Sequence, residues 1–298
     1  MSFPVPSEEL MQQALGLPTA PQHIRTGGFK AVYRMHKVSG ESEALKAVYI
    51  PAAISEEDNV RRNQLVARAK REIEALGRCD SPYLVKLGDM AATMHNIGGH
   101  DYLVYSEEFL PGDSLNAWIG KQPPTDYETL HALFSILVSL IRTLTRIGYL
   151  HRDIKPDNIV DTGLQDRRFV MLDLGIAYKM HGTELTQGGS PPGTLRYMAP
   201  ELLRADYKDN MDFRCDLYAA GLTVYVLASG THPFAPQPEH TYATVYRIMK
   251  TRPKPLAVHR PDIPVGFCSL IDRCLRKQPA LRFAQLDAVE EELRKVQP

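Results

Sequence analysis

The residue pattern changes at Leu110-Pro111-Gly112, and this change constrains the fold more than any other feature of the chain. Before it, short runs rich in Val, Ile, Tyr and Phe alternate with turn residues, a pattern typical of antiparallel strands. After it, long apolar runs predominate, and the run at residues 129–148 is apolar almost all round, which predicts a buried helix. We therefore expect an α+β fold with a small, mostly β lobe followed by a larger, mainly helical lobe.

The first lobe is expected to hold a five-stranded antiparallel sheet and one helix. The predicted strands are residues 23–26, 29–38, 43–50, 83–90 and 101–109. Gly27-Gly28 separates the first two strands, and residues 95–100 are a turn-rich stretch before the last one. Residues 54–76 are charged, lack proline and repeat apolar side chains at helical spacing, so they predict a helix that ends near Gly77.

These elements define the expected domain organisation. Residues 1–21 carry several prolines around a short helix at residues 7–15, and we expect them to form an N-terminal extension. Residues 22–298 then form one domain, with an N-lobe over 22–109 and a C-lobe over 110–298. The extension has three possible roles on this evidence: it docks a partner, folds back on the small lobe or stays disordered.

Bulk composition excludes several classes of protein. The chain has 35 basic and 35 acidic residues, which gives no support for a whole-chain nucleic-acid or membrane-surface binder. Its four cysteines form no CxxC pair, so reduced core thiols are expected rather than a metal site or disulfides. The N-terminus lacks the pattern of a signal peptide, and the purely apolar stretches are shorter than the ~20 residues that span a bilayer. A cytoplasmic location is the expectation.

The stretch HRDIKPDN at residues 151–158 carries the clearest chemistry. Asp173 follows twenty residues after Asp153, behind an apolar run that resembles a strand. Phosphoryl transfer requires metal-held phosphates and a positioned nucleophile, and these residue types supply both. Asp173 and Asn158 would bind Mg²⁺, Asp153 would accept or orient the proton of the attacking hydroxyl, and Lys155 would neutralise charge on the transferred group.

Together with DLG at 173–175 and MAPE at 198–201, this stretch resembles the eukaryotic-type protein kinase family, serine/threonine subgroup. The resemblance covers about residues 22–296. It implies a two-lobed kinase fold and transfer of the γ-phosphoryl group of ATP to Ser or Thr hydroxyls of protein substrates. The implied metal is Mg²⁺, with Mn²⁺ as the alternative.

The resemblance assigns further residues one at a time. Lys46, in ALKAVYI, matches the lysine that pairs with the α- and β-phosphates, and Glu72 matches the helix glutamate that holds it. Asp216 matches the aspartate that anchors the catalytic loop. Arg282 matches the arginine that pairs with the glutamate of APE, here Glu201.

The glycine-rich loop departs from the family pattern. Of the three glycines in G-x-G-x-x-G, only the middle one survives, as Gly27, with Gly28 beside it. Arg25 and Lys30 occupy the first and third glycine positions, and the two cations either attract ATP or only face solvent. The resemblance also assigns Val32, Ala44 and Val160 to the nucleotide site.

A second departure lies at the expected hinge that receives adenine. Glu108 and Leu110 match the residues whose carbonyl and amide contact the base. Glu107 then falls on a position that is usually apolar or Thr. Either a one-residue shift or bulge explains this, or the back of the adenine pocket is unusually polar.

The segment before MAPE indicates substrate class and regulation. Lys155 and Thr194 favour Ser/Thr over Tyr specificity. Arg152 is the arginine that in this family often binds a phosphate on the activation segment. The candidate phosphorylation sites are Thr183, Thr186, Ser190 and Thr194. Self-association would allow such a phosphate to be added by a second copy.

Two other functions compete with this interpretation. A pseudokinase scaffold would bind partners with weak or no catalysis, although such proteins typically lose residues of the Lys46, Asp153 or Asp173 type. A kinase-fold enzyme for small molecules generally lacks the APE-closed activation segment. Both alternatives are less well supported than an active protein kinase.

Overall fold

The computed structural model describes residues 3–121, 124–174, 178–179, 195–204, 211–235 and 241–298. The chain divides into two compact units, one of Met1–Arg78 with Val85–Leu110 and one of Cys79–Leu84 with Pro111–Pro298. The first holds a five-stranded antiparallel sheet and the second is mainly helical, which confirms the expected α+β class. The boundaries differ from those expected: the N-terminal extension belongs to the first unit, and residues 79–84 group with the second.

The sheet of the first unit has the strand order β1-β2-β3-β5-β4. Its strands are β1 (Gln22–Gly27), β2 (Lys30–His36), β3 (Ser42–Ile50), β4 (Thr93–Ile97) and β5 (His100–Glu108). Every neighbouring pair is antiparallel. β3 and β5 are therefore inner strands, each paired along both edges.

The predicted fourth strand at residues 83–90 was wrong. The strand that pairs with β5 is Thr93–Ile97, because Gly98 and Gly99 have φ values of +59° and +83° and close a two-residue hairpin directly behind it. The stretch at 83–90 contributes isolated bridges instead, such as Leu87 with Glu107. The HNIGGH segment that looked like a loop is thus partly strand.

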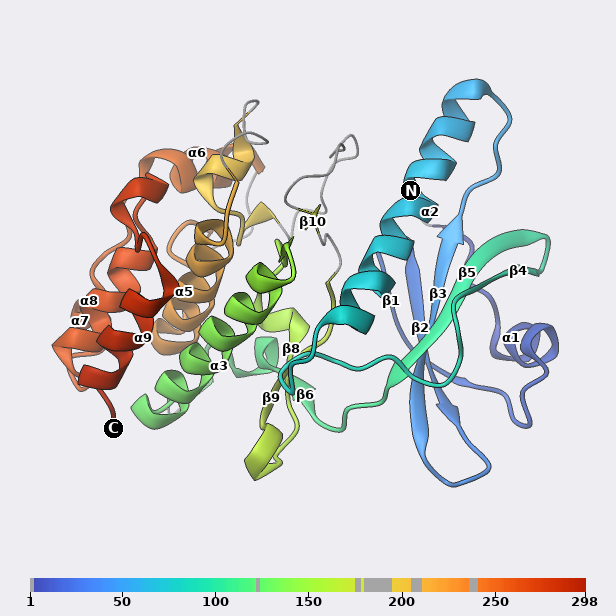
Figure 1. Cartoon of the computed structure of the whole chain (residues 1–298), viewed down its shortest axis with the longest axis horizontal. Coiled ribbons are helices and arrows are strands. Elements are labelled where there is room, and N and C mark those ends of the chain that lie inside the picture. Colours follow the sequence, from blue (N-terminus) through green and yellow to red (C-terminus); the bar gives the residue numbers. More distant parts are fainter. Residues whose placement is uncertain (1–2, 122–123, 175–177, 180–194, 205–210, 236–240) are drawn as a thin grey trace. The chain divides into compact units, whose positions relative to one another are not determined.

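Strand alternation gives the sheet two apolar faces, and the N-terminal extension covers one of them. Met11 of α1 (Glu8–Leu15) is fully buried in a cluster with Leu45 and Ala47 of β3. Tyr33 donates a hydrogen bond to the carbonyl of Pro6, and Tyr102 donates one to that of Pro4. Figure 1 shows α1 beside the β4–β5 end of the sheet. The extension therefore folds back on the small lobe.

Helix α2 (Glu56–Arg78) covers the opposite face. Alternate residues of β3 and β5, among them Val48 and Tyr105, form a second cluster with Ala69 of α2. Leu65 and Ile73 of the helix pack against the same cluster. Because successive strand residues point to opposite faces, Lys46 and Glu107 also belong to the face that α2 covers.

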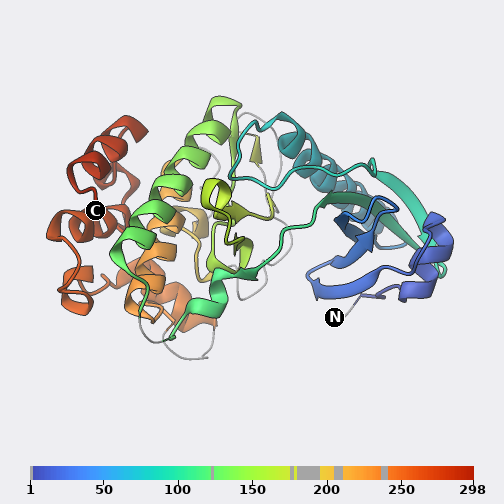
Figure 2. The same cartoon turned by 90° about the horizontal axis from the view of Figure 1, so that it is seen from below.

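The second unit is built around α5 (Arg214–Ser229). Its residues from Cys215 to Ala228 are all buried. Gly221 allows the close approach of α8, since a Cβ there would lie 2.7 Å from the Cβ of Cys274. The surrounding helices are α3 (Tyr127–Arg146), α6 (Thr241–Lys250), α7 (Leu256–His259), α8 (Val265–Cys274) and α9 (Leu286–Lys295). Figures 1 and 2 show α3 alongside α5 and α9.

By length and composition, α3 is the one helix among the described residues that could cross a membrane. Half of its most apolar stretch is buried within the structure, as expected for a core helix that packs on α5 and α9.

Short strands and turns complete the second unit. The strands are β6 (Asp113–Ser114), β7 (Tyr149–Leu150), β8 (Ile159–Asp161), β9 (Phe169–Met171) and β10 (Tyr178–Lys179). The 3₁₀ turns are Leu115–Trp118, Pro156–Asn158, Gln165–Arg167, Pro200–Leu203 and Pro279–Leu281. β8 and β9 form a hairpin in which Ile159 faces Met171. The residues just before β8 and just after β9 are therefore neighbours.

The role of the extension can be tested with Met11→Ala. Truncating this fully buried side chain should lower the free energy of unfolding by about 2–5 kcal/mol, because a cavity is left in the sheet face. Leu10→Ala on the same helix is the control, since Leu10 is 40% exposed and should cost about 0.5 kcal/mol or less. Denaturant unfolding measures both values. Equal, small losses would show that α1 is not part of the core.

Candidate active site

A buried carboxylate anchors the loop at residues 151–158. Asp216, in the first turn of α5, accepts hydrogen bonds from the backbone amides of His151 and Arg152, each at 2.7 Å. Arg152 has a φ of +65°, a left-handed conformation that is strained for a residue with a side chain. Burial raises the pKa of Asp216 to about 6, while the two amides oppose that rise. The hydrogen bonds that the two amides donate to Asp216 hold the loop in its strained conformation.

Three predicted site residues meet within this loop. The Lys155 ammonium lies 2.8 Å from both carboxylate oxygens of Asp153. The Asn158 amide donates to the Asp153 side chain at 2.8 Å and to its carbonyl at 3.0 Å. Burial raises the pKa of Asp153, and Lys155 and Asn158 oppose the rise. The result is a carboxylate held in one orientation by two donors, as a proton acceptor needs to be.

Asp173 and Asn158 lie at the same end of the β8–β9 hairpin. Asn158 comes directly before β8, and its carbonyl accepts from the amide of Leu172 at 2.8 Å. The Asp173 carboxylate adds to the rise that burial causes in the pKa of Asp153 and opposes the fall that burial causes in the pKa of His151, so its charge acts on the catalytic loop. Because the Asn158 Nδ2 donates to Asp153, its Oδ1 remains for a cation. A carboxylate and an amide oxygen are suitable ligands for a hard divalent cation.

His151 is held in its neutral form. Its Nδ1 accepts from the amide of Asp153 at 3.2 Å, which requires that nitrogen to be deprotonated. Burial lowers the pKa of His151 to about 3. The neutral imidazole is thus one of the supports of the loop.

The predicted pair between Glu201 and Arg282 is present. The Arg282 guanidinium donates to the two carboxylate oxygens of Glu201 at 2.6 and 2.7 Å. It also donates to the carbonyls of Arg214, Arg276 and Lys277, and its side chain has no exposed surface. The geometry uses the planar fork of arginine and joins the segment after residue 194 to α5 and to the chain that follows α8.

Lys46 differs from expectation in its partner. The predicted partner was Glu72, but the ion pair of Lys46 within the first unit is with Glu107, at 2.5 Å. Glu72 instead accepts from Lys30 at 2.9 Å and from the Tyr105 hydroxyl at 3.2 Å. Sequence reasoning missed both pairings. The available signals were a carboxylate at a usually apolar position and a lysine where the family has glycine.

The glycine hairpin also differs in detail. Gly27 ends β1 and pairs with Lys30, so the two turn residues are Gly28 and Phe29 rather than Gly27 and Gly28. Gly28 has a φ of +58°, as the first position of a II′ hairpin turn requires. Of the two alternatives left open for Lys30, the one in which it only faces solvent is wrong, because its ammonium pairs with Glu72. The attraction of ATP by Lys30 stays a prediction.

The ladder between β3 and β5 tests one explanation offered for Glu107 at the expected hinge, a bulge. It runs from Ile50 opposite Asp101 to Glu43 opposite Glu108 without a register shift. No bulge displaces Glu107 in this ladder, so that explanation is wrong. The assignment of Glu108 and Leu110 to the adenine stays a prediction.

The remaining predicted nucleotide residues lie on strands of the two units. In the first unit, Val32 is buried opposite Lys46, and Ala44 lies opposite Glu107. In the second, Val160 is buried on β8. The candidate phosphorylation sites Thr183, Thr186, Ser190 and Thr194 lie outside the described residues.

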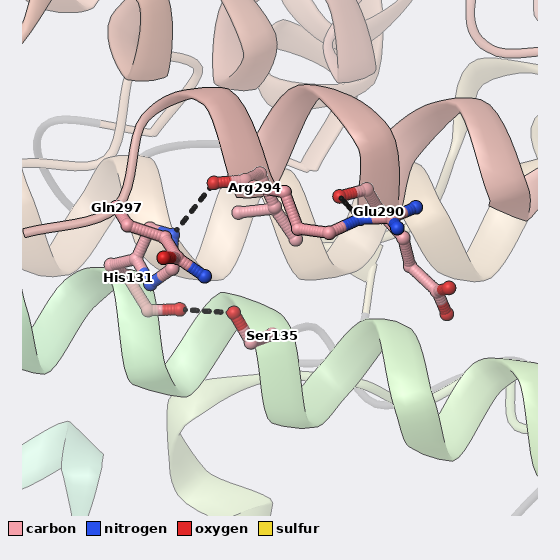
Figure 3. A pocket seen from close by; sticks show the side chains of 6 residues that line it. His131, Ser135, Glu290, Arg294 and Gln297 are labelled. Atoms are coloured by element: carbon pink, nitrogen blue, oxygen red, sulfur yellow. Dashed lines mark hydrogen bonds between the residues drawn. The ribbon is translucent and has the colours of Figure 1, made fainter.

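A hollow between α3 and α9 is separate from these residues (Figure 3). It is lined by His131, Ser135, Glu290, Leu293, Arg294 and Gln297. Its polar groups bond to one another: the His131 ring contacts the carbonyl of Leu293 at 3.1 Å, and Ser135 donates to the carbonyl of His131 at 2.9 Å. None of the predicted site residues lines it.

Comparison with known proteins identifies the family. The model of the protein kinase domain matches residues 19–293. Serine/threonine-protein kinase pkn3 of Myxococcus xanthus is 30% identical over 281 residues, which cover 92% of this chain. Serine/threonine-protein kinase PknH of Mycobacterium bovis is 29% identical over 276 residues, which cover 91%. The chain belongs to the protein kinase family, as its motifs predicted.

A solved structure agrees on the fold. The kinase domain of PknI from Mycobacterium tuberculosis superposes with a TM-score of 0.62 at 22% identity, covering 92% of this chain and 94% of that one. The chain corresponds to 48% of the length of pkn3 and 43% of that of PknH, so it spans less than half of these two relatives.

Arg282→Lys tests the buried pair. A lysine keeps the charge but cannot donate to two carboxylate oxygens and three carbonyls at once, so the free energy of unfolding should fall by about 3 kcal/mol. Arg276→Lys, the same change at an exposed arginine, should cost about 0.5 kcal/mol or less. Chemical denaturation of both variants decides the matter, and matched values would contradict the role of Arg282.

His151 predicts a pH dependence of stability. Its folded pKa of about 3 lies below the usual value of 6.5, so its stabilisation is present above about pH 6.5 and is lost as the pH falls toward 3. The stability advantage of the protein over His151→Phe should shrink by about 1.4 kcal/mol per pH unit between about pH 6 and pH 4. Urea unfolding at several pH values measures this difference. If the free energies of unfolding of the two proteins changed in parallel with pH, burial would not lower the pKa of His151 in this way.

Proposed function

We propose that the chain is an ATP-dependent serine/threonine protein kinase. The observation that carries the proposal is the arrangement of Asp153, Lys155 and Asn158 in a loop anchored by Asp216. Asp153 would accept or orient the proton of the substrate hydroxyl. Lys155, bonded to the same carboxylate, would neutralise charge on the transferred group.

Divalent metal and nucleotide binding follow from the same family assignment. Asn158 and Asp173 would hold Mg²⁺, with Mn²⁺ as the alternative, and the metal would neutralise the phosphates. Lys46 would pair with the α- and β-phosphates, while the amides near Gly27 and Gly28 would approach them. The adenine would be received by Val32, Ala44, Glu108, Leu110 and Val160.

The substrate class is a protein with Ser or Thr hydroxyls. Lys155 in the catalytic loop supports this class, and both relatives named above are serine/threonine kinases. Self-association with phosphorylation of the activation segment, a cytoplasmic location and the absence of nucleic-acid or membrane binding are parts of the proposal. They rest on the motif set and on the balanced charge of the chain.

The decisive experiment measures transfer of labelled phosphate from ATP to a generic protein substrate. The protein should transfer phosphate with Mg²⁺, and Asp153→Asn, Asp173→Asn and Lys46→Ala should each reduce the rate on the order of 100-fold or more, because each removes a group that acts on the reacting atoms. Arg276→Lys should behave like the unmodified protein.

The outcomes separate the competing functions. Equal transfer by all variants would overturn the assigned roles. Nucleotide binding without transfer by the unmodified protein would favour a pseudokinase scaffold. Transfer to a small molecule but to no protein would favour a small-molecule phosphotransferase.

A further inference from the structure

Glu107 is a buried carboxylate that the proposed mechanism leaves without a role. Its side chain is 1% exposed, and its Oε1 lies 2.5 Å from the ammonium of Lys46, which is 4% exposed. A buried charge is costly unless a partner compensates it, so each of these side chains depends on the other.

Strand register explains why these two residues meet. β3 and β5 are adjacent and antiparallel, with Lys46 directly opposite Tyr105. Glu107 is two residues further along β5, so it is the diagonal neighbour of Lys46 on the same face, within reach of long side chains. The ladder is unbroken, and both strands are inner strands of the sheet. Hydrogen-bonded backbone on both sides thus holds the pair in place.

The helix glutamate is engaged elsewhere. Glu72 of α2 accepts from the Lys30 ammonium at 2.9 Å and from the Tyr105 hydroxyl at 3.2 Å. Its side chain is 7% exposed, and that of Lys30 is 19% exposed. Lys30 begins β2, directly after the glycine turn, so this pair joins the glycine hairpin to α2.

The two departures from the family pattern therefore complement each other. A carboxylate at position 107 pairs with Lys46, and a lysine at position 30 neutralises Glu72. The carboxylate at position 107 alone would place two carboxylates, Glu72 and Glu107, beside one cation. The lysine at position 30 alone would place two cations, Lys30 and Lys46, beside one carboxylate. With both changes, the first unit supplies two cations and two carboxylates, which pair as Lys46 with Glu107 and Lys30 with Glu72.

We propose that Glu107, rather than Glu72, is the positioning residue for Lys46, and that the Lys30–Glu72 pair fastens the glycine hairpin to α2. The proposal rests on the proposed function, in which Lys46 acts on the phosphates of ATP. Its consequence is that a displacement of α2 would leave the carboxylate partner of Lys46 in place, because that partner belongs to the sheet.

The first experiment compares the kinetics of two conservative variants. Glu107→Gln should lower kcat/KM for ATP on the order of tenfold or more, because Lys46 loses the charge that orients it. Glu72→Gln should cost less than about threefold, and Glu74→Gln, at an exposed position of the same helix, should have no effect. In a Lys46→Met background, Glu107→Gln should cause no further loss, since its effect acts through Lys46.

A rescue experiment separates positioning from a merely structural role. The double variant Lys30→Met/Glu107→Met removes one cation and one carboxylate together. Glu72 then has no Lys30 to pair with and becomes available to pair with Lys46, as the family pattern implies. This double variant should be more active than Glu107→Met alone. In the double variant, Glu72→Gln should now cost on the order of tenfold or more. Melting temperatures of all variants show which of them are folded. If Glu107→Gln does not fold, the double variant still tests the proposal, because it removes one positive and one negative charge together.

The results distinguish this proposal from the kinase function itself. Failure of the unmodified protein to transfer phosphate would overturn the function. Transfer by the unmodified protein, with a larger loss for Glu72→Gln than for Glu107→Gln, would overturn the proposal while leaving the function intact. An equal cost of Glu72→Gln with and without the Lys30→Met/Glu107→Met change would also overturn it.

Discussion

The catalytic loop depends on two hydrogen bonds, which the backbone amides of His151 and Arg152 donate to the buried carboxylate of Asp216. They hold Arg152 at a positive φ, and this turn directs the chain so that Asp153, Lys155 and Asn158 converge. Asp216 is in the first turn of α5, a helix that is buried from Cys215 to Ala228, so the loop is attached to a rigid element of the second unit. Strain in a short loop can persist when the surrounding structure is rigid enough to hold it.

The first unit is stabilised in a different way: alternate strand residues form one apolar cluster on each face of its sheet. One face of its sheet is covered by α1, which the N-terminal extension supplies, and the other by α2. Two of the charged pairs on the second face are Lys46 with Glu107 and Lys30 with Glu72. The extension is therefore part of the hydrophobic core, although its prolines and short length resembled those of a peripheral segment.

Much of the fold could be predicted because it depends on local patterns. The buried helix at 129–148 was found from its apolar run, and the catalytic loop from a motif whose residues all lie within eight positions. The fourth strand was misplaced because Tyr83–Met90 has a strand-like composition, whereas Thr93–Ile97 is paired by the glycine turn that follows it. Strand pairing is decided by turn geometry as well as by propensity.

The sequence by itself determined the division into a β-rich and a helical part, the kinase family and the residues that can carry phosphoryl transfer, because these depend on residue type and spacing. Only the tertiary structure decided which charges pair. Lys46 has two glutamates within the first unit that could neutralise it, one on a helix and one on the neighbouring strand. The β3–β5 register brings Glu107 to 2.5 Å, and Lys30 occupies Glu72. The Coulomb energy of an ion pair depends on the distance between its charges and on how far they are removed from water. Both are properties of the folded chain.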